Sequence, residues 1–326
     1  MGNAHRARGD DHRAVQCLKR SVETRERTGD RQGLAICLNN IARVYFYRGE
    51  LTAAKSSTEA ALKIFEEVGD KKGVLIARSN LGEAAHHLGQ LEAARRLYSA
   101  NLELAQRLRI QRLLETNLCN LGSLETDAGE YNVALGYLRS CLRSMPEEKP
   151  VELRAQALGA LGAVSIRLHD LERAEDALRE ALDISRELRL REKLGWLASL
   201  EVRLHLEKGD PDQALAAGKK FLRQLDHGVE KLGVALFHRE MGRVYRELGP
   251  DWADQTEKHL TKALKEFESM QSPHHAAATR IELGVYWRLL GEQNEANALF
   301  QKAEEEFRKI GAPRRLEELR SLGVRS

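Results

Sequence analysis

The stretch from Leu75 to Leu108, LIARSNLGEAAHHLGQLEAARRLYSANLELAQRL, contains the pattern that the rest of the chain repeats. It predicts two helices joined by a tight turn. In the second helix Ala94, Tyr98 and Leu102 follow one another at four-residue spacing, which places them on one face. Gly89 follows the last periodic residue of the first helix, where a left-handed C-cap favours glycine. Within such a pair one apolar face stays uncovered, so the pair is not stable alone. We therefore expect it to pack against neighbouring pairs.

The turn residue recurs at a nearly fixed interval along the whole chain. The steps are 40 residues, except for a final step of 42 because two residues are added after Gly249. The equivalents are Gly9, Gly49, Gly89, Gly129, His169, Gly209, Gly249 and Gly291. His169 indicates that the turn accepts a side chain, although that conformation is uncommon for an L-residue. A constant period over a whole chain is typical of a solenoid.

Small residues follow the same period at two further positions. Seven residues before the turn stand Gly2, Ala42, Gly82, Gly122, Gly162, Val202, Gly242 and Gly284. Five residues after it stand Ala14, Ala54, Ala94, Ala134, Ala174, Ala214 and Ala296. Small side chains at both positions let the two helices of a pair approach closely, and larger ones would overpack the contact.

With Asn80-Leu81-Gly82, Gly89, Ala94 and Tyr98 in one repeat, the chain resembles tetratricopeptide repeat proteins. Its period of 40 residues, rather than the commoner period of about 34, makes it similar to the longer-repeat arrays of bacterial signalling proteins, STAND-type regulators and peptide-binding adaptors. The resemblance implies an all-α fold, a right-handed α-solenoid of stacked antiparallel helix pairs. We expect a partial N-terminal repeat at residues 1–34, seven helix pairs at 35–311 and a C-terminal capping helix at 312–326.

The start of the chain is irregular. Met1 lies where the other repeats are halfway along their first helix, so that helix lacks its first two turns and leaves the next repeat uncapped. Solenoids usually end in a modified repeat with a polar outer face. The sequence therefore suggests either part of a longer protein or an internal start, with a frayed natural end as the alternative. It also suggests self-association through the uncapped face.

The composition indicates which partners the protein binds and in which cellular compartment it lies. The 52 basic and 49 acidic residues give a net charge of +3, which argues against a nucleic-acid partner. No apolar run approaches the roughly 20 residues of a membrane span, and the N-terminus lacks a secretory signal. Four scattered cysteines, Cys17, Cys37, Cys119 and Cys141, are typical of reduced thiols. We therefore expect a cytoplasmic protein without a membrane partner.

Three asparagines occupy one register position, two residues before the small residue of consecutive repeats. They are Asn40, Asn80 and Asn120. In related arrays the first helices line a concave groove, and an asparagine at this position bonds the backbone of a bound peptide. A carboxamide suits this role because it both donates and accepts hydrogen bonds. The alternative is that these asparagines bond to one another or to the facing helix.

The same register predicts the rest of a partner-binding groove. Its members run from a polar N-terminal third through an apolar middle to a charged C-terminal third: Arg43, Tyr47, Glu83, His87, Trp196, Arg203, Arg243 and Arg246. A matching ligand would be extended, apolar in its centre and acidic at one end, with Arg243 and Arg246 forming a carboxylate clamp. The alternatives are that these arginines pair with nearby glutamates and that Trp196 belongs to the core.

The sequence contains no signal for catalysis, a cofactor or a metal. The glycines serve turns and packing, and none forms a phosphate-binding loop. The pairs His86-His87 and His274-His275 are adjacent residues whose side chains point about 100° apart on a helix, which makes poor chelates. Neither pair has a cysteine or carboxylate at ligand spacing. We therefore expect no enzyme, no cofactor and no metal site.

The sequence favours a non-enzymatic protein–protein interaction scaffold that binds a peptide or protein segment in its concave groove. The alternative is a sensor or regulatory arm of a larger bacterial signalling protein, an ATPase regulator or a kinase. Both functions follow from the family resemblance, because a fold alone does not specify a ligand.

Overall fold

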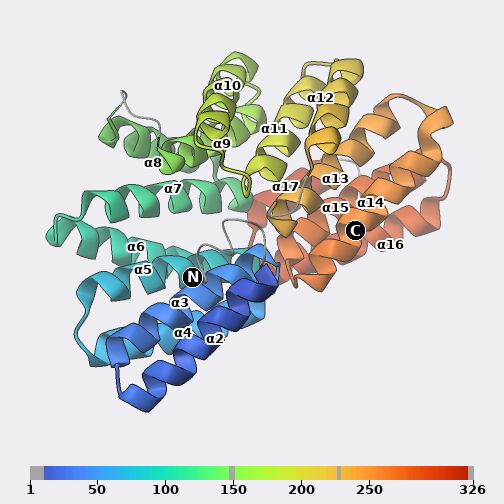
Figure 1. Ribbon diagram of the computed structural model, residues 1–326. Coiled ribbons are helices and arrows are strands. Elements are labelled where there is room, and N and C mark those ends of the chain that lie inside the picture. Colours follow the sequence, from blue (N-terminus) through green and yellow to red (C-terminus); the bar gives the residue numbers. More distant parts are fainter. Residues whose placement is uncertain (1–10, 147–150, 226–228, 322–326) are drawn as a thin grey trace.

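The computed structural model describes residues 11–146, 151–225 and 229–321, and within these ranges the chain contains helices and no strand (Figure 1). With the helix numbering of Figure 1, the α-helices are α2 Asp11–Thr28, α3 Arg31–Tyr47, α4 Leu51–Glu67, α5 Lys71–His87, α6 Leu91–Arg107, α7 Gln111–Ala128, α8 Tyr131–Ser144, α9 Glu152–Arg167, α10 Leu171–Glu187, α11 Leu194–Glu207, α12 Pro211–Gln224, α13 Lys231–Glu247, α14 Ala253–Ser269, α15 Pro273–Leu289, α16 Gln293–Ile310 and α17 Pro313–Ser321. A short 3₁₀ helix, Pro250–Trp252, accommodates the two extra residues before α14.

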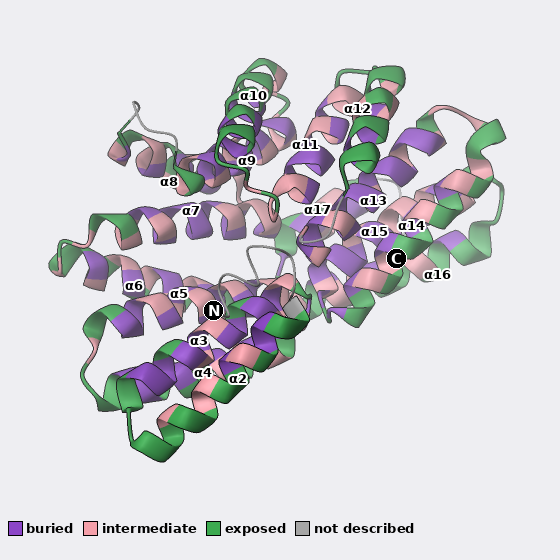
Figure 2. Cartoon of the chain, viewed as in Figure 1, coloured by how far each residue is buried: buried purple, intermediate pink, exposed green. Residues whose placement is uncertain are grey.

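The predicted all-α solenoid is confirmed. Helices α3 to α16 form seven consecutive pairs, and each pair stacks on the next (Figure 1). Figure 2 shows buried residues on the faces between helices and exposed residues on the outer helices such as α10 and α12. None of the helices among the described residues is long and apolar enough to cross a membrane.

Among the described turn residues, Gly49, Gly89, Gly129, His169, Gly209 and Gly291 have the positive φ that the sequence predicts, and Gly249 combines a positive φ with an extended ψ. The φ angle is 74° at Gly49 and Gly89 and 55° at His169. After Gly89 the chain closes the helix end with bonds from Gly89 N to His86 O at 2.9 Å and from Gln90 N to Ala85 O at 2.8 Å. This double bond pattern satisfies carbonyls that the helix itself leaves free.

A second series of left-handed residues lies halfway between the first, at the connection from one pair to the next. Its members are Gly29, Gly69, Arg109, Arg189, Gln271 and Gly311. The sequence analysis did not register this series as a repeat, because three of its six members carry side chains. Helix ends therefore recur about every 20 residues, and most of those described carry a residue with positive φ; α8 and α12 end instead in the extended residues Met145 and Leu225.

The small residues permit the close approach within each pair. A Cβ atom on Gly82 would lie 2.5 Å from the ring of Tyr98, and one on Gly122 would lie 2.5 Å from Cγ of Leu138. In the fifth pair the sizes are exchanged, because buried Val202 occupies the small position and Gly218 occupies the position that elsewhere carries the large residue.

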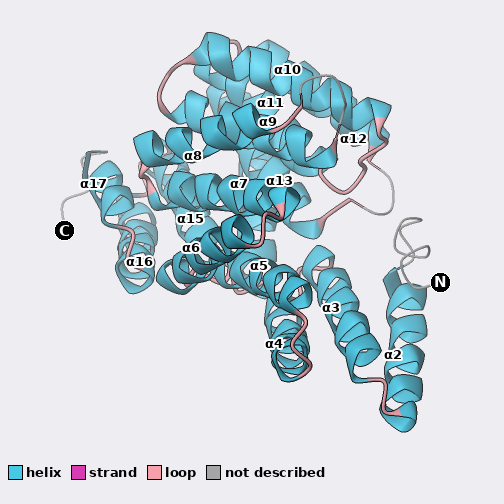
Figure 3. Ribbon diagram, turned by 90° about the vertical axis from the view of Figure 1, so that its left-hand side faces the viewer, coloured by secondary structure: helices cyan, strands magenta, loops and turns pink. Residues whose placement is uncertain are grey.

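The two ends of the solenoid contact each other. Thr52 Oγ1 donates a hydrogen bond to Gln271 Oε1 at 2.8 Å, although 219 positions separate them. One apolar cluster unites Phe46 and Leu51 with Phe267 and Met270. A second cluster contains residues of α5 to α7 together with residues of α15 to α17. Figure 3 shows α15 and α16 beside α6, in agreement with the second cluster.

The inner surface that the sequence predicts as a partner-binding groove lies inside this closure. The inner surface of the first helices faces other helices across an enclosed space, because the array turns far enough for α13 to α17 to reach α3 to α7. The terminal helix takes part in the closure. Tyr131 donates a hydrogen bond to Glu318, and Arg315 donates one to the Tyr131 hydroxyl at 3.3 Å.

The chain ends are only partly described. The shortened first helix of the N-terminal repeat falls within residues 1–10, outside the described residues, so the uncapped face stays a prediction. Its second helix, α2, packs on α3 through Ala14, Val15 and Leu18. At the other end Leu319 of α17 is buried with Phe307, whereas Leu322 lies outside the described residues.

The close approach at Gly122 can be tested by substitution. Gly122→Leu places a large side chain against Leu138, and we expect it to lower the free energy of unfolding by about 1–3 kcal/mol through overpacking. Urea denaturation followed by circular dichroism measures the change. The control is Gly136→Ala, because a Cβ at this exposed helical position meets no atom within 4 Å. Alanine there should stabilise the helix by up to about 1 kcal/mol, and equal losses in both variants would contradict the packing argument.

Candidate functional site

The closed solenoid surrounds a cavity of about 150 Å³. Its walls come from the inner helices α5, α7, α9, α11, α13 and α15, with Arg315 added from α17. A second, more open space of about 450 Å³ adjoins it, which we call the vestibule. Five residues line both spaces, and we call them the charged neck: Arg167, Arg203, Arg239, Glu240 and Arg315.

One wall of the cavity is apolar. It is formed by Ala160, Ala163, Trp196, Leu200, Leu232 and Leu236. Trp196 also packs against core residues of neighbouring helices, and a Cβ on Gly159 would lie 2.6 Å from its ring. Trp196 therefore both lines the cavity, as the sequence predicts, and belongs to the core, as the alternative holds.

The charged neck holds more positive charge than its carboxylates neutralise. Arg167 forms no hydrogen bond or ion pair with any described residue, and burial together with Arg203 and Arg315 holds its pKa well below the ordinary value. Arg203 Nε is buried without a hydrogen-bond partner and lies 3.8 Å from Glu207. Arg315 pairs with Glu318 at 2.6 Å but also has an unpartnered Nε. These guanidinium groups keep hydrogen-bonding capacity for an anion.

The predicted clamp of Arg243 and Arg246 is already occupied by the protein itself. Arg243 contacts Glu240 at 2.8 Å and Glu207 at 3.0 Å, and Arg246 contacts Glu282 at 2.7 Å. Both arginines therefore follow the alternative of pairing with glutamates. Both arginines are largely shielded from solvent, so pairing with the carboxylates within reach is favoured.

The same network sets the charge of Glu240. Burial alone would raise the pKa of its carboxyl, but Arg243, Arg239 and Arg203 outweigh burial and lower the pKa to about 2. On another wall half-buried Lys193 and buried Glu230 form an ion pair at 3.2 Å. Glu240 and Lys193 are therefore committed to structural pairs.

The three predicted asparagines separate in the structure. Asn80 Nδ2 donates to Asn39 Oδ1 at 2.9 Å, which agrees with the alternative that asparagines bond to one another. Asn120 is buried and lines the cavity. Asn40 lines neither the cavity nor the vestibule.

The other predicted contacts divide among three places. Glu83, His87, Asn120, Trp196 and Arg203 line the cavity. Arg203 and Arg243 line the vestibule, whereas Arg43, Tyr47, Asn80 and Glu83 surround a small space of about 20 Å³. Arg246 lies in none of these spaces. Sequence reasoning missed Arg167 and Arg315, because closure of the ring is what brings them together.

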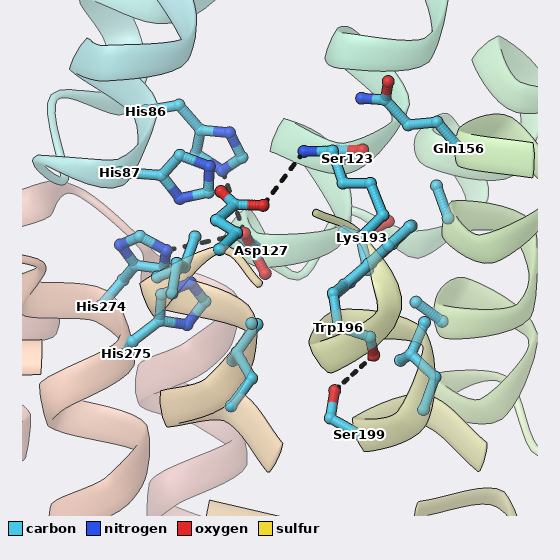
Figure 4. A pocket seen from close by; sticks show the side chains of 18 of the residues that line it. His86, His87, Ser123, Asp127, Gln156, Lys193, Trp196, Ser199, His274 and His275 are labelled. Carbon is cyan, nitrogen blue, oxygen red and sulfur yellow. Dashed lines mark hydrogen bonds and ion pairs between the residues drawn. The ribbon is translucent and has the colours of Figure 1, made fainter. Parts of the chain in front are cut away.

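Closure also assembles a group that we call the histidine cluster: His86, His87, Asp127, His274 and His275 (Figure 4). His86 and His87 come from the end of α5, and His274 and His275 come from the start of α15. The rings of His86 and His274 are stacked with centroids 5.7 Å apart. Burial lowers the pKa of His87, His274 and His275, so these imidazoles are neutral at pH 7.

The histidine cluster removes the geometric reason for expecting no metal site. The sequence analysis treated the two histidine pairs separately and found no carboxylate beside either. The structure places both pairs beside Asp127 of α7. No local spacing could have shown this, because the pairs lie in different repeats and meet only through the closed ring.

Comparison with known families confirms the resemblance to tetratricopeptide repeat proteins. Residues 1–67 and 73–147 match one tetratricopeptide repeat model, and residues 39–106 match another. Beyond residue 147 the helices continue the same paired arrangement. No curated protein matches the chain.

Several solved structures share the fold. A Rap protein complexed with competence and sporulation factor is 16% identical, with 86% of this chain and 81% of that chain covered and a TM-score of 0.66. The Rap conjugation gene regulator of plasmid pLS20, in complex with the Phr* peptide, is 14% identical, with 83% and 72% covered and a TM-score of 0.67.

Two further structures widen the range of functions on this fold. Aspartyl phosphate phosphatase F from Bacillus subtilis is 15% identical, with 94% of this chain and 68% of that chain covered and a TM-score of 0.55. A STAND protein with a tetratricopeptide repeat sensor from Pyrococcus horikoshii is 15% identical, with 81% and 42% covered and a TM-score of 0.53. At these identities the likeness concerns the fold, and function depends on the site residues.

The charge of Glu240 makes a testable contribution to stability. Its carboxyl has an ordinary pKa of 4.5, which the folded protein lowers to about 2. The ionised form therefore stabilises the fold above pH 4.5, and this contribution is lost as the pH falls from 4.5 to 2. We expect Glu240→Gln to lower the free energy of unfolding at pH 7 by about 3–5 kcal/mol, because it leaves buried arginines unpaired.

Urea denaturation at a series of pH values measures both effects. The variant should show a weaker pH dependence than the native protein between pH 4.5 and 2. Glu247→Gln is the control, because the exposed Glu247 forms a surface pair with Arg246 at 3.2 Å. That variant should lose at most about 1 kcal/mol. An unchanged pH dependence in Glu240→Gln would show that its carboxylate is not held by the arginines.

Proposed function

We propose that this tetratricopeptide repeat array is an interaction scaffold that binds a short peptide or protein segment carrying a carboxylate at the charged neck. The observation that carries the proposal is the guanidinium of Arg167, which has no carboxylate partner among the described residues and lies near Arg203 and Arg315. Like charges close together in a partly buried site are unfavourable. A bound carboxylate would relieve this repulsion and accept hydrogen bonds from the guanidinium groups.

The surroundings of the neck suit the remainder of such a segment. The apolar wall around Trp196 and Leu200 can cover one apolar side chain within about 150 Å³. The larger vestibule, at about 450 Å³, offers room for the following residues. Asn120 presents a carboxamide inside the cavity, where it can donate to a peptide carbonyl and accept from a peptide amide.

The comparisons support a peptide ligand by analogy. Both Rap structures were determined with a peptide or signalling factor bound, as their names state. That support extends to the class of ligand and leaves the sequence of the segment undefined. The proposal that the chain has no enzymatic activity rests on the site, since the charged groups Glu240 and Lys193 are held in ion pairs.

A sensor arm of a larger signalling protein is the second candidate function. It is favoured by the STAND neighbour, whose tetratricopeptide repeat region has the same fold and of which this chain covers 42%. In that case the bound segment would be the effector. A bacterial source, a cytoplasmic location and self-association through the N-terminal repeat remain parts of this proposal.

An immobilised library of pentapeptides with free C-terminal carboxylates tests the proposed function against the same library with amidated ends. We expect the native protein to enrich peptides from the carboxylate library only. Arg167→Gln should weaken the enriched peptide by about 10- to 150-fold, which corresponds to the loss of a charge-assisted hydrogen bond of about 1.5–3 kcal/mol. Fluorescence anisotropy with the labelled peptide measures the affinity.

Three further variants make the test specific. Arg179→Gln is the matched control, because Arg179 is exposed on α10 and pairs with Asp176. Asn120→Ala should weaken binding, whereas Asn80→Ala should leave it unchanged because Asn80 bonds to Asn39. Equal enrichment from both libraries, or native affinity in Arg167→Gln, would reject the charged neck as the binding site.

A further inference from the structure

The histidine cluster contains imidazole nitrogens that lie close to the Asp127 carboxylate without well-formed hydrogen bonds. His86 Nε2 lies 3.0 Å from Oδ2 of Asp127, and His274 Nε2 lies 3.6 Å from the same oxygen. Asp127 faces both imidazoles as a charge partner, but neither nitrogen has a well-formed hydrogen bond with a described residue. Three potential ligand atoms from three different helices therefore point to one small volume (Figure 4).

Further imidazole nitrogens of the cluster also lack partners. They are His87 Nδ1, His274 Nδ1 and His275 Nε2. His86, His274 and His275 are each less than a tenth exposed, at 3%, 4% and 7%. A buried polar atom without a partner costs about 1–3 kcal/mol, so a concentration of such atoms in one place indicates a missing ligand.

The separations match the coordination sphere of a small divalent ion. Zinc binds histidine nitrogen and carboxylate oxygen at about 2.0–2.2 Å, and tetrahedral geometry then places two ligand atoms about 3.3–3.5 Å apart. The two distances to Asp127, 3.0 and 3.6 Å, lie on either side of this value. All three ligand atoms lie within 4.8 Å of one another.

We propose that His86, Asp127 and His274 bind one divalent transition-metal ion of the zinc class. Imidazole nitrogens and a carboxylate oxygen are ligands that such ions prefer, and three protein ligands leave a fourth position for water. His87 and His275 adjoin the site, with ring centroids 6.0 Å apart, and are the nearest candidates for that fourth position after a rearrangement.

The ion would join parts of the chain that are far apart in sequence. His86 belongs to α5, Asp127 to α7 and His274 to α15, so the coordination bonds would cross the closure of the solenoid. Metal binding would then stabilise the closed ring in which the cavity is enclosed. This inference is independent of the proposed carboxylate ligand, because it uses a different set of side chains.

The test begins with the full chain freed of metal by dialysis against a chelator. Isothermal titration calorimetry with zinc chloride should show one ion per chain, and cobalt chloride should give the visible absorption of a site with nitrogen and oxygen ligands. His274→Gln and Asp127→Asn should each weaken zinc binding by at least about 10- to 100-fold. His205→Gln is the matched control, because it removes a histidine of α11 that lies outside the histidine cluster.

Hydrogen–deuterium exchange tests the link to closure. Zinc should slow amide exchange at the end of α5 and the start of α15 in the native protein and not in His274→Gln. Circular dichroism checks that each variant is folded, and His86→Gln replaces any variant that is not. Absence of zinc binding, or equal affinity in the native protein and the ligand variants, would overturn the metal site. Zinc binding that leaves exchange in α5 and α15 unchanged would overturn its role in closure.

Discussion

The close approach of the two helices in each repeat is the constraint on which the rest of the structure depends. At Gly82, Gly122 and Gly162 a Cβ atom would collide with Tyr98, Leu138 or Leu178 of the partner helix. Because this contact recurs with the same spacing, each pair is added to the array in a similar orientation. The rotation accumulates until α13 to α17 reach α3 to α7, and the ring closes.

Closure changes the chemistry of the concave surface. Side chains that would be solvated in an open groove become buried, so each charge must find a partner or remain costly. Arg243 pairs with Glu240, and Arg246 pairs with Glu282. Arg167 in the charged neck has no ion-pair partner among the described residues, and several imidazole nitrogens of the histidine cluster have no hydrogen-bond partner there. These two places are where the molecule has unused binding capacity.

The fold is shared with other proteins, whereas the candidate sites depend on side chains of this chain. Structures at 14–16% identity share the arrangement of helices, while their names describe a Rap protein, a conjugation gene regulator and an aspartyl phosphate phosphatase. The charged neck and the histidine cluster consist of side chains that the repeat pattern does not require. They are therefore the features by which this chain can be distinguished from other arrays with the same architecture.

The sequence by itself determined the repeat. The spacing of Gly49, Gly89 and Gly129 and of the small residues before them predicted the helix pairs and their turns, since these depend on local backbone conformation and on contacts between neighbouring helices. Register also assigned Asn120, Trp196 and Arg203 to one groove, and these three residues line the cavity. It did not show that Asn80 bonds to Asn39, because that depends on side-chain orientation.

Only the tertiary structure decided which distant repeats meet. Asp127 lies between His86 and His274, and Arg167 lies near Arg315, because pairs five steps apart in the array meet. Each pair contributes a small rotation, and the sum over the array determines whether its ends touch. The pattern that repeats every 40 residues specifies how one helix pair forms. It does not specify the total rotation of the array, and this rotation determines which repeats meet.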